Sequence, residues 1–177
     1  MKTLFHNHTS DIAFQKFEEQ FESILHKEYP HINSFYIDCY TIDQYKQLDE
    51  VPNIMDMKND TFAYSVDVKI LDKQRTVFAA IIYSPALCEI LNFTEEEKLA
   101  SIGHEVGHII HYFNENLIGA SSMMIEVKAD EVVTKLGWAE HLKSVLQKLQ
   151  SSNLYSREQC QLMDLRILFL GSKQLFL

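Results

Sequence analysis

One short stretch of the sequence concentrates residue types that bind metal ions. Residues 100–113 read ASIGHEVGHIIHYF and place His104, Glu105 and His108 in the pattern HExxH. On a helix, residues four apart lie on the same face, so both imidazoles can reach one ion at about 2.0–2.1 Å. The carboxylate next to the first histidine can then act on water as a general base. The spacing predicts Zn²⁺ bound by His104 and His108, with Glu105 as the catalytic group.

The helix that carries this motif is expected to be buried on two sides. Its apolar residues fall opposite the histidines, and they are Leu99, Ile102, Val106, Ile109, Ile110 and Phe113. One side would therefore pack in a core and the other would line a site. His111 also falls on the histidine side, where it is either a neighbour of the ligands or a substrate contact. The alternative is a chance HExxH, which would leave two buried histidines to find other hydrogen-bond partners.

A catalytic zinc ion keeps three protein ligands and one open position. In the next expected helix, MIEVKADEVVTKLGW, Glu126 and Asp130 share one face and Lys128, Glu131 and Lys135 share the opposite face. Acids that face inward are costly unless they are paired or bind metal. We predict Glu126 as the third ligand and Asp130 as the group that orients a ligand imidazole. Two acids at the edge of a core are the alternative.

The elements that would position these residues indicate an α+β fold. Ser10 and Asp11 are a typical helix start, and Pro30 would end that N-terminal helix. Alternating patterns predict strands in NSFYIDCYT, TFAYSVDVKIL and TVFAAIIYS, with a hairpin turn at 72–75, so a small antiparallel sheet is expected. The capping signal TEEE at Thr94 opens a helical half, with helices to about Phe113, over 122–136, and in AEHLKSVLQKLQ and REQCQLMDLRILFL.

The two motif helices together resemble the gluzincin metallopeptidases, which combine HExxH with a downstream ExxxD helix. The sequence has HEVGH at 104–108 and EVKAD at 126–130, followed by LGW. The ExxAD form is most similar to the HtpX and CAAX-prenyl-protease family and its small soluble relatives, the minigluzincins. The resemblance covers about residues 77–137 and implies a zincin-like fold. It also implies a zinc metalloendopeptidase, a hydrolase that acts on peptides or unfolded proteins.

The resemblance has two further implications for the substrate cleft. It implies that the strand TVFAAIIYS is an edge strand that lines the cleft and pairs with an extended peptide; an internal strand that fills the core is the alternative. It also requires a residue that polarises the scissile carbonyl. The candidates are Tyr155, Arg157, Arg166 and His111, and DLRILFL resembles the family's arginine segment at Arg166.

Two other functions fit the same residues. HExxH metallopeptidases that are fused to or paired with repressors are one, although they usually have Asn after the alanine, where this chain has Asp130. A non-catalytic zinc-stabilised interaction module is the other. A fourth protein ligand would favour the module, whereas an exchangeable water molecule would favour an enzyme.

Length and composition suit one domain. The 177 residues are 46% hydrophobic and 23% charged, and we expect a single zincin-like domain over 1–177. It would comprise an N-terminal helix and strands (1–75), a zinc-site core (76–137) and C-terminal helices (138–177). A net charge of −9 argues against nucleic-acid and anionic-membrane partners. Three scattered cysteines and the lack of a membrane-spanning apolar stretch predict a cytoplasmic protein.

Overall fold

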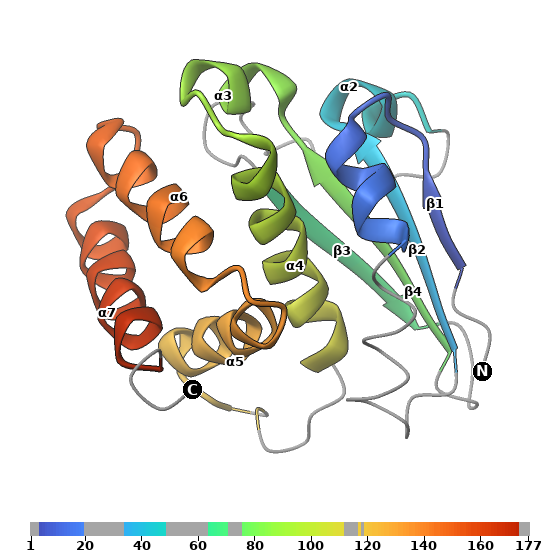
Figure 1. Cartoon of the computed structure of the whole chain (residues 1–177). Coiled ribbons are helices and arrows are strands. Elements are labelled where there is room, and N and C mark those ends of the chain that lie inside the picture. Colours follow the sequence, from blue (N-terminus) through green and yellow to red (C-terminus); the bar gives the residue numbers. More distant parts are fainter. Residues whose placement is uncertain are drawn as a thin grey trace. The chain divides into compact units, whose positions relative to one another are not determined.

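The computed structural model describes residues 4–19, 34–48, 64–70, 76–111, 117 and 119–173. The chain divides into two compact units, Met1–Glu89 and Ile90–Leu177, and each is described by itself. The first unit contains a sheet and the second contains helices, so the α+β class is confirmed (Figure 1). The single domain expected over residues 1–177 stays a prediction.

The N-terminal unit contains a four-stranded mixed sheet. Its strands are β1 (Leu4–Asn7), β2 (Ser34–Thr41), β3 (Tyr64–Ile70) and β4 (Thr76–Tyr83), and they lie in the order β1-β2-β4-β3. β1 and β2 are parallel, as are β2 and β4, whereas β3 and β4 are antiparallel. The predicted β3–β4 pairing is confirmed, and its turn at 72–75 lies outside the described residues. The prediction of a purely antiparallel sheet is wrong.

Connection length explains the error. Parallel neighbours need a crossover connection, and such a connection leaves no local mark comparable to a hairpin turn. A helix over residues 12–19 connects β1 to β2, and α2 (Ile42–Lys46) follows β2. Asp11 accepts a hydrogen bond from the Ala13 N–H at 3.0 Å, which confirms the predicted helix start. The rest of that helix, up to Pro30, lies outside the described residues, and β1 precedes it.

β4 is an internal strand, so the predicted edge strand is a second error. Thr76 to Tyr83 are all in register with β2, and Val77 to Tyr83 are also in register with β3. The backbone of β4 therefore pairs on both sides and cannot add a substrate strand. The physical reason is the apolar content of the strand, which suits a central position covered on both faces. Its buried residues include Ala79, Ile81, Ile82 and Tyr83.

Aromatic residues form the core of this unit. The helix at 12–19 lies across one face of the sheet (Figure 1). It contributes Phe14 and Phe17, which are 0% and 1% exposed. Their rings lie 5.1 Å from the Tyr83 ring and 5.7 Å from the Phe5 ring, respectively. Burial of such large rings is the dominant stabilising contribution in a small sheet of this kind.

The C-terminal unit contains the helices that were expected after Thr94. After α3 (Pro85–Ile90), which crosses the boundary between the units, come α4 (Glu95–His111), α5 (Ser122–Lys135), α6 (Ala139–Ser151) and α7 (Arg157–Lys173). The capping signal is confirmed, because the Thr94 N–H donates to Glu97 Oε2 at 2.7 Å and the Glu97 N–H donates to Thr94 Oγ1 at 3.2 Å. Gly137 follows Leu136, the C-cap of α5, and its φ of 80° suits glycine.

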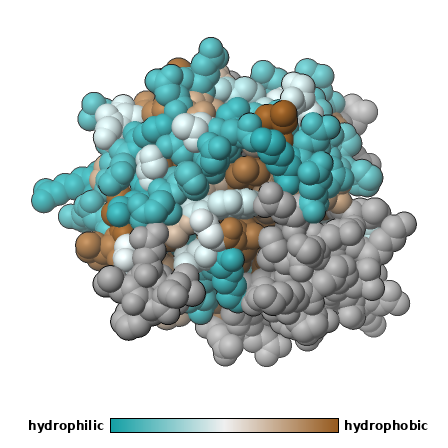
Figure 2. Space-filling model, viewed as in Figure 1, coloured by the Kyte–Doolittle hydropathy of each residue, from teal (hydrophilic) through white to brown (hydrophobic). Residues whose placement is uncertain are grey.

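The remaining sequence predictions concern the surface and the thiols. Hydrophilic side chains dominate the described surface on the face shown in Figure 2. Among the described residues, no helix is both long enough and apolar enough to cross a bilayer. The three cysteines are free; Cys39 and Cys88 are buried and Cys160 is partly exposed.

Candidate metal centre

α4 and α5 approach each other closely because both have a small residue at the contact. A Cβ atom added to Gly107 would lie 2.6 Å from Cα and from the carbonyl oxygen of Ala129. Only glycine permits this backbone contact. Gly107 lies inside HEVGH and Ala129 inside EVKAD. The close contact between α4 and α5 therefore brings the two motifs together.

The three predicted ligands converge at this crossing. Nε2 of His104 and Nε2 of His108 lie 3.0 Å apart. Glu126 Oε2 is 3.2 Å from His104 Nε2, and Glu126 Oε1 is 3.6 Å from His108 Nε2. One donor atom of each residue lies within 4.8 Å of the other two. Ligands at about 2.0–2.1 Å around a tetrahedral ion are separated by about 3.3 Å, so the residues fit a shared zinc ion.

Asp130 lies behind the first histidine, as predicted. Its Oδ1 is 2.8 Å from His104 Nδ1, and the side chain is fully buried. A proton on Nδ1 that is donated to this carboxylate leaves the Nε2 lone pair pointing toward the other donors. The contact with Asp130 therefore favours a proton on Nδ1 and holds the orientation of the ring.

Arg166 of α7 joins the two acids of α5. Its Nε and Nη2 donate to the two carboxylate oxygens of Asp130 at 2.9 and 2.7 Å. Its Nη1 is 2.8 Å from Glu126 Oε2, and its Nη2 is 3.2 Å from His104 Nδ1. The side chain is 7% exposed. Of the four residues proposed to polarise a carbonyl, Arg166 is placed in this cluster, and its guanidinium holds the carboxylates in place.

With both imidazoles neutral, as metal ligands must be, the cluster contains more negative than positive charge. The ionisable carboxyl groups are those of Glu105, Glu126 and Asp130, and Arg166 is their cationic partner. If both imidazoles are neutral, two negative charges are unbalanced in a largely buried region. Charges in such a region are costly unless they are compensated. A divalent cation would balance the group.

Glu105 is the predicted catalytic residue, and it is 9% exposed. Its pKa is raised to about 7, mainly by burial and to a smaller extent by the charge of Glu126. The charges of His104 and Arg166 act in the opposite direction. Burial and Arg166 lower the pKa of His104, but hydrogen bonds with Asp130 and Glu126 raise it to about 9. Both shifts reduce the net negative charge of the group.

The pKa values of His108 and Glu126 are both lowered. Burial and the charge of His104 lower the pKa of His108 to about 4, so its imidazole is neutral and can act as a metal ligand. Burial alone would raise the pKa of Glu126, but its hydrogen bond with His104 and the charges of His104, Arg166 and His108 lower it to about 2. Glu126 is therefore ionised near neutral pH.

The remaining carbonyl-polarising candidates lie in other surroundings. His111 is half-buried, and its pKa is lowered by burial and by the charges of Lys128 and Lys135. Both lysines lie on the face of α5 opposite Glu126. Arg157 is exposed at the first residue of α7. Tyr155 is partly buried, and burial raises its pKa. On the same face of α5, Lys128 forms the expected local ion pair with Glu131 at 2.8 Å.

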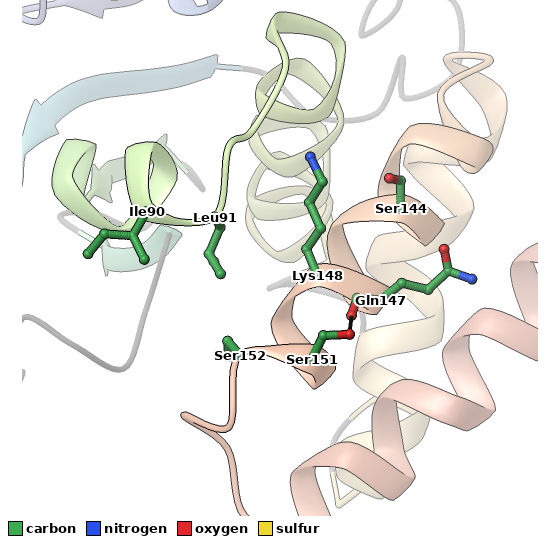
Figure 3. A pocket seen from close by; sticks show the side chains of 7 residues that line it. All are labelled: Ile90, Leu91, Ser144, Gln147, Lys148, Ser151 and Ser152. Atoms are coloured by element: carbon green, nitrogen blue, oxygen red, sulfur yellow. Dashed lines mark hydrogen bonds between the residues drawn. The ribbon is translucent and has the colours of Figure 1, made fainter.

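A pocket of about 370 Å³ lies elsewhere in this unit (Figure 3). Its lining residues are Ile90, Leu91, Ser144, Gln147, Lys148, Ser151 and Ser152. The Lys148 ammonium is already paired, because Nζ lies 2.6 Å from Glu97 Oε2 and 2.6 Å from the Asn92 carbonyl oxygen. None of the lining residues belongs to the His104 group, so we assign no chemistry to this pocket.

Comparisons with known proteins do not name the site. No protein-family model matches the chain, and no curated protein or solved structure matches it. The resemblance to gluzincins therefore rests on the two sequence motifs.

Sequence reasoning missed the feature that joins the two motifs. Gly103 and Gly107 lie four residues apart on α4, and Ala129 faces Gly107. Small residues at helical spacing are a signal of close helix packing, and this signal could have identified the α4–α5 contact. The guanidinium of Arg166 could not have been paired with Asp130 from the sequence, because 35 residues lie between them.

Proposed function

We propose that this chain is a zinc-dependent metalloendopeptidase of the gluzincin type. The convergence of one donor atom each from His104, His108 and Glu126 carries the proposal. Two imidazoles and one carboxylate are a ligand set typical of catalytic zinc. Among the described residues the group has three members, which favours a catalytic ion over a zinc-stabilised interaction module with four protein ligands.

Each residue of the cluster has a role in this proposal. Zinc bound there would lower the pKa of a water molecule and polarise a peptide carbonyl. Glu105 follows His104 directly, and it would accept a proton from the attacking water and deliver it to the leaving nitrogen. Asp130 and Arg166 hold the ligands in orientation. The peptide substrate class rests on the resemblance of HEVGH and EVKAD to metallopeptidases.

The test is hydrolysis of denatured casein by metal-free protein before and after addition of Zn²⁺. Activity should appear only with zinc, and Glu105→Gln should retain bound zinc but lose activity by about 10²–10⁴-fold, because an amide cannot accept the proton. Zinc-dependent activity that persists in Glu105→Gln would exclude Glu105 as the base.

Metal content is measured separately by elemental analysis. Wild-type protein should bind one zinc ion tightly at the cluster, and His108→Ala should lose that ion because it removes one of three ligands. His141→Gln, on α6, is a control that should retain it. Full zinc content in His108→Ala would contradict the ligand assignment.

A further inference from the structure

A second group of imidazole and carboxylate side chains lies on the sheet of the N-terminal unit. His6 is in β1 and Asp38 of β2 is in register with it, so both side chains are on the same face of the sheet. His8 directly follows β1, and its side chain contacts Asp38 on this face. The buried side chains of the opposite face are Phe5, Ile37 and Cys39. Two histidines and one carboxylate are therefore gathered on the exposed side of two neighbouring strands.

His8 and Asp38 already have the spacing of two ligands. His8 Nε2 and Asp38 Oδ1 are 2.9 Å apart, close to the separation of about 3 Å for two donors on one ion. The His8 ring stacks on Tyr40, with centroids 4.5 Å apart and planes 2° apart. The His8 N–H donates to the Cys39 carbonyl at 3.0 Å, and Gln44 Nε2 donates to the His8 carbonyl at 2.7 Å. Both the ring and the backbone of His8 are thus held in place.

His6 would complete the group if its side chain moved toward His8. The ring centroids of His6 and His8 are 6.4 Å apart, compared with 4.6 Å for His104 and His108. Two imidazoles on one tetrahedral ion have centroids about 5 Å apart. His6 must therefore approach by about 1 Å, and its side chain is exposed and free to change rotamer.

We propose that His6, His8 and Asp38 form a second metal site for a divalent first-row transition-metal ion such as Zn²⁺. Imidazole is a good ligand for these ions, and the carboxylate supplies negative charge. The site is weaker than the His104 group, because the His8 and Asp38 side chains are 46% and 40% exposed. Water competes for the ion there, and His6 must lose rotamer freedom when it binds.

Zinc titration of the full chain against a competing chelator tests the proposal. Wild type should show a tight class and a weaker class of sites. His8→Gln should lose the weaker class and keep the tight one, and His6→Gln should reduce the affinity of the weaker class. His141→Gln should keep both. Circular dichroism confirms that each variant remains folded.

This experiment can contradict either metal-site proposal without contradicting the other. His108→Ala should lose the tight class and keep the weaker one, because its substitution lies in the other unit. A weaker class that is unchanged in His8→Gln, or a wild-type chain with one class of sites at saturating Zn²⁺, would overturn the second site. Neither result bears on the His104 group.

Discussion

The buried carboxylates in the two halves of α4 differ in how their charge is balanced. Near its N-terminus, Glu97 is 3% exposed, and each of its oxygens has a close donor. Oε2 accepts hydrogen bonds from Lys148 Nζ at 2.6 Å and from the Thr94 N–H at 2.7 Å. Oε1 accepts one from Ser144 Oγ at 2.6 Å. One carboxylate meets one ammonium, so the group is neutral.

In the second half of the helix, carboxyl groups outnumber guanidinium groups. Glu105 and the two acids of α5 face one guanidinium, that of Arg166. A balanced buried pair connects helices and needs nothing further. When both imidazoles are neutral, the form that binds a metal, the group has excess negative charge and can bind a cation. The comparison therefore distinguishes a structural cluster from the proposed metal site by their charge, although both contain buried carboxylates and a cationic side chain.

Removal of the guanidinium should have the largest effect at the second cluster. Arg166→Leu leaves Asp130 and Glu126 with His104 as their remaining partner, and without zinc it should lower the free energy of unfolding by about 3–5 kcal/mol. Added Zn²⁺ should recover part of this loss, because the ion supplies positive charge and binds only the folded state. Thermal and urea unfolding with and without zinc measure both effects.

The matched substitution at the balanced cluster is Lys148→Leu. Lys148 is 30% exposed, and Glu97 keeps its bonds with Ser144 and Thr94, so the loss should be about 1 kcal/mol. Zinc should stabilise this variant no more than it stabilises wild type. Equal losses in the two variants, with equal zinc responses, would contradict the distinction between the clusters.

The next largest effect concerns the α4–α5 contact. Gly107→Ala adds a methyl group 2.6 Å from the Ala129 backbone, which must separate the helices at a cost of about 1–3 kcal/mol. Zinc affinity should fall with stability because Glu126 moves with α5. Gly103→Ala is the control, since its methyl group meets the flexible end of Leu136 at 3.1 Å. Similar zinc affinity in both variants would show that the crossing does not set ligand positions.

A smaller effect is expected from substitution of Asp130, which contacts His104. Asp130→Asn keeps the size of the side chain but weakens its acceptance of the His104 Nδ1 proton. Zinc affinity should fall by about 10–100-fold, which a competition titration can measure. Unchanged affinity would mean that Asp130 serves Arg166 and does not act on the metal ligand.

The smallest effect is a pH dependence at the balanced cluster. Burial would raise the pKa of Glu97, but its hydrogen bonds with Lys148, Ser144 and Thr94 lower it below the ordinary 4.5. Ionised Glu97 therefore stabilises the fold above pH 4.5, and this contribution is lost as the pH falls through the lowered pKa. We expect the stability difference between wild type and Glu97→Gln, at most about 1 kcal/mol, to shrink below pH 4.5 in urea unfolding. A constant difference would show that this carboxylate does not titrate with folding.

The sequence predicted the helical unit well because its signals are local. The periodicity around His104 gave the two faces of α4, and the spacing of Glu126 and Asp130 gave their shared face on α5. The sheet order was not predictable in the same way. Pairing between β2 and β4 depends on a crossover connection, and a four-residue strand such as β1 shows no alternation that distinguishes it from a loop.

The strand order of the sheet also bears on how the chain acquires its structure during synthesis. Ser34 pairs with Thr76, so the sheet cannot close until both have left the ribosome. Contacts between residues distant in sequence are slow to form. β4, which pairs with both β2 and β3, is the last strand of the sheet to be synthesised. A translation pause near residue 90 would give the sheet time to form before the helices follow.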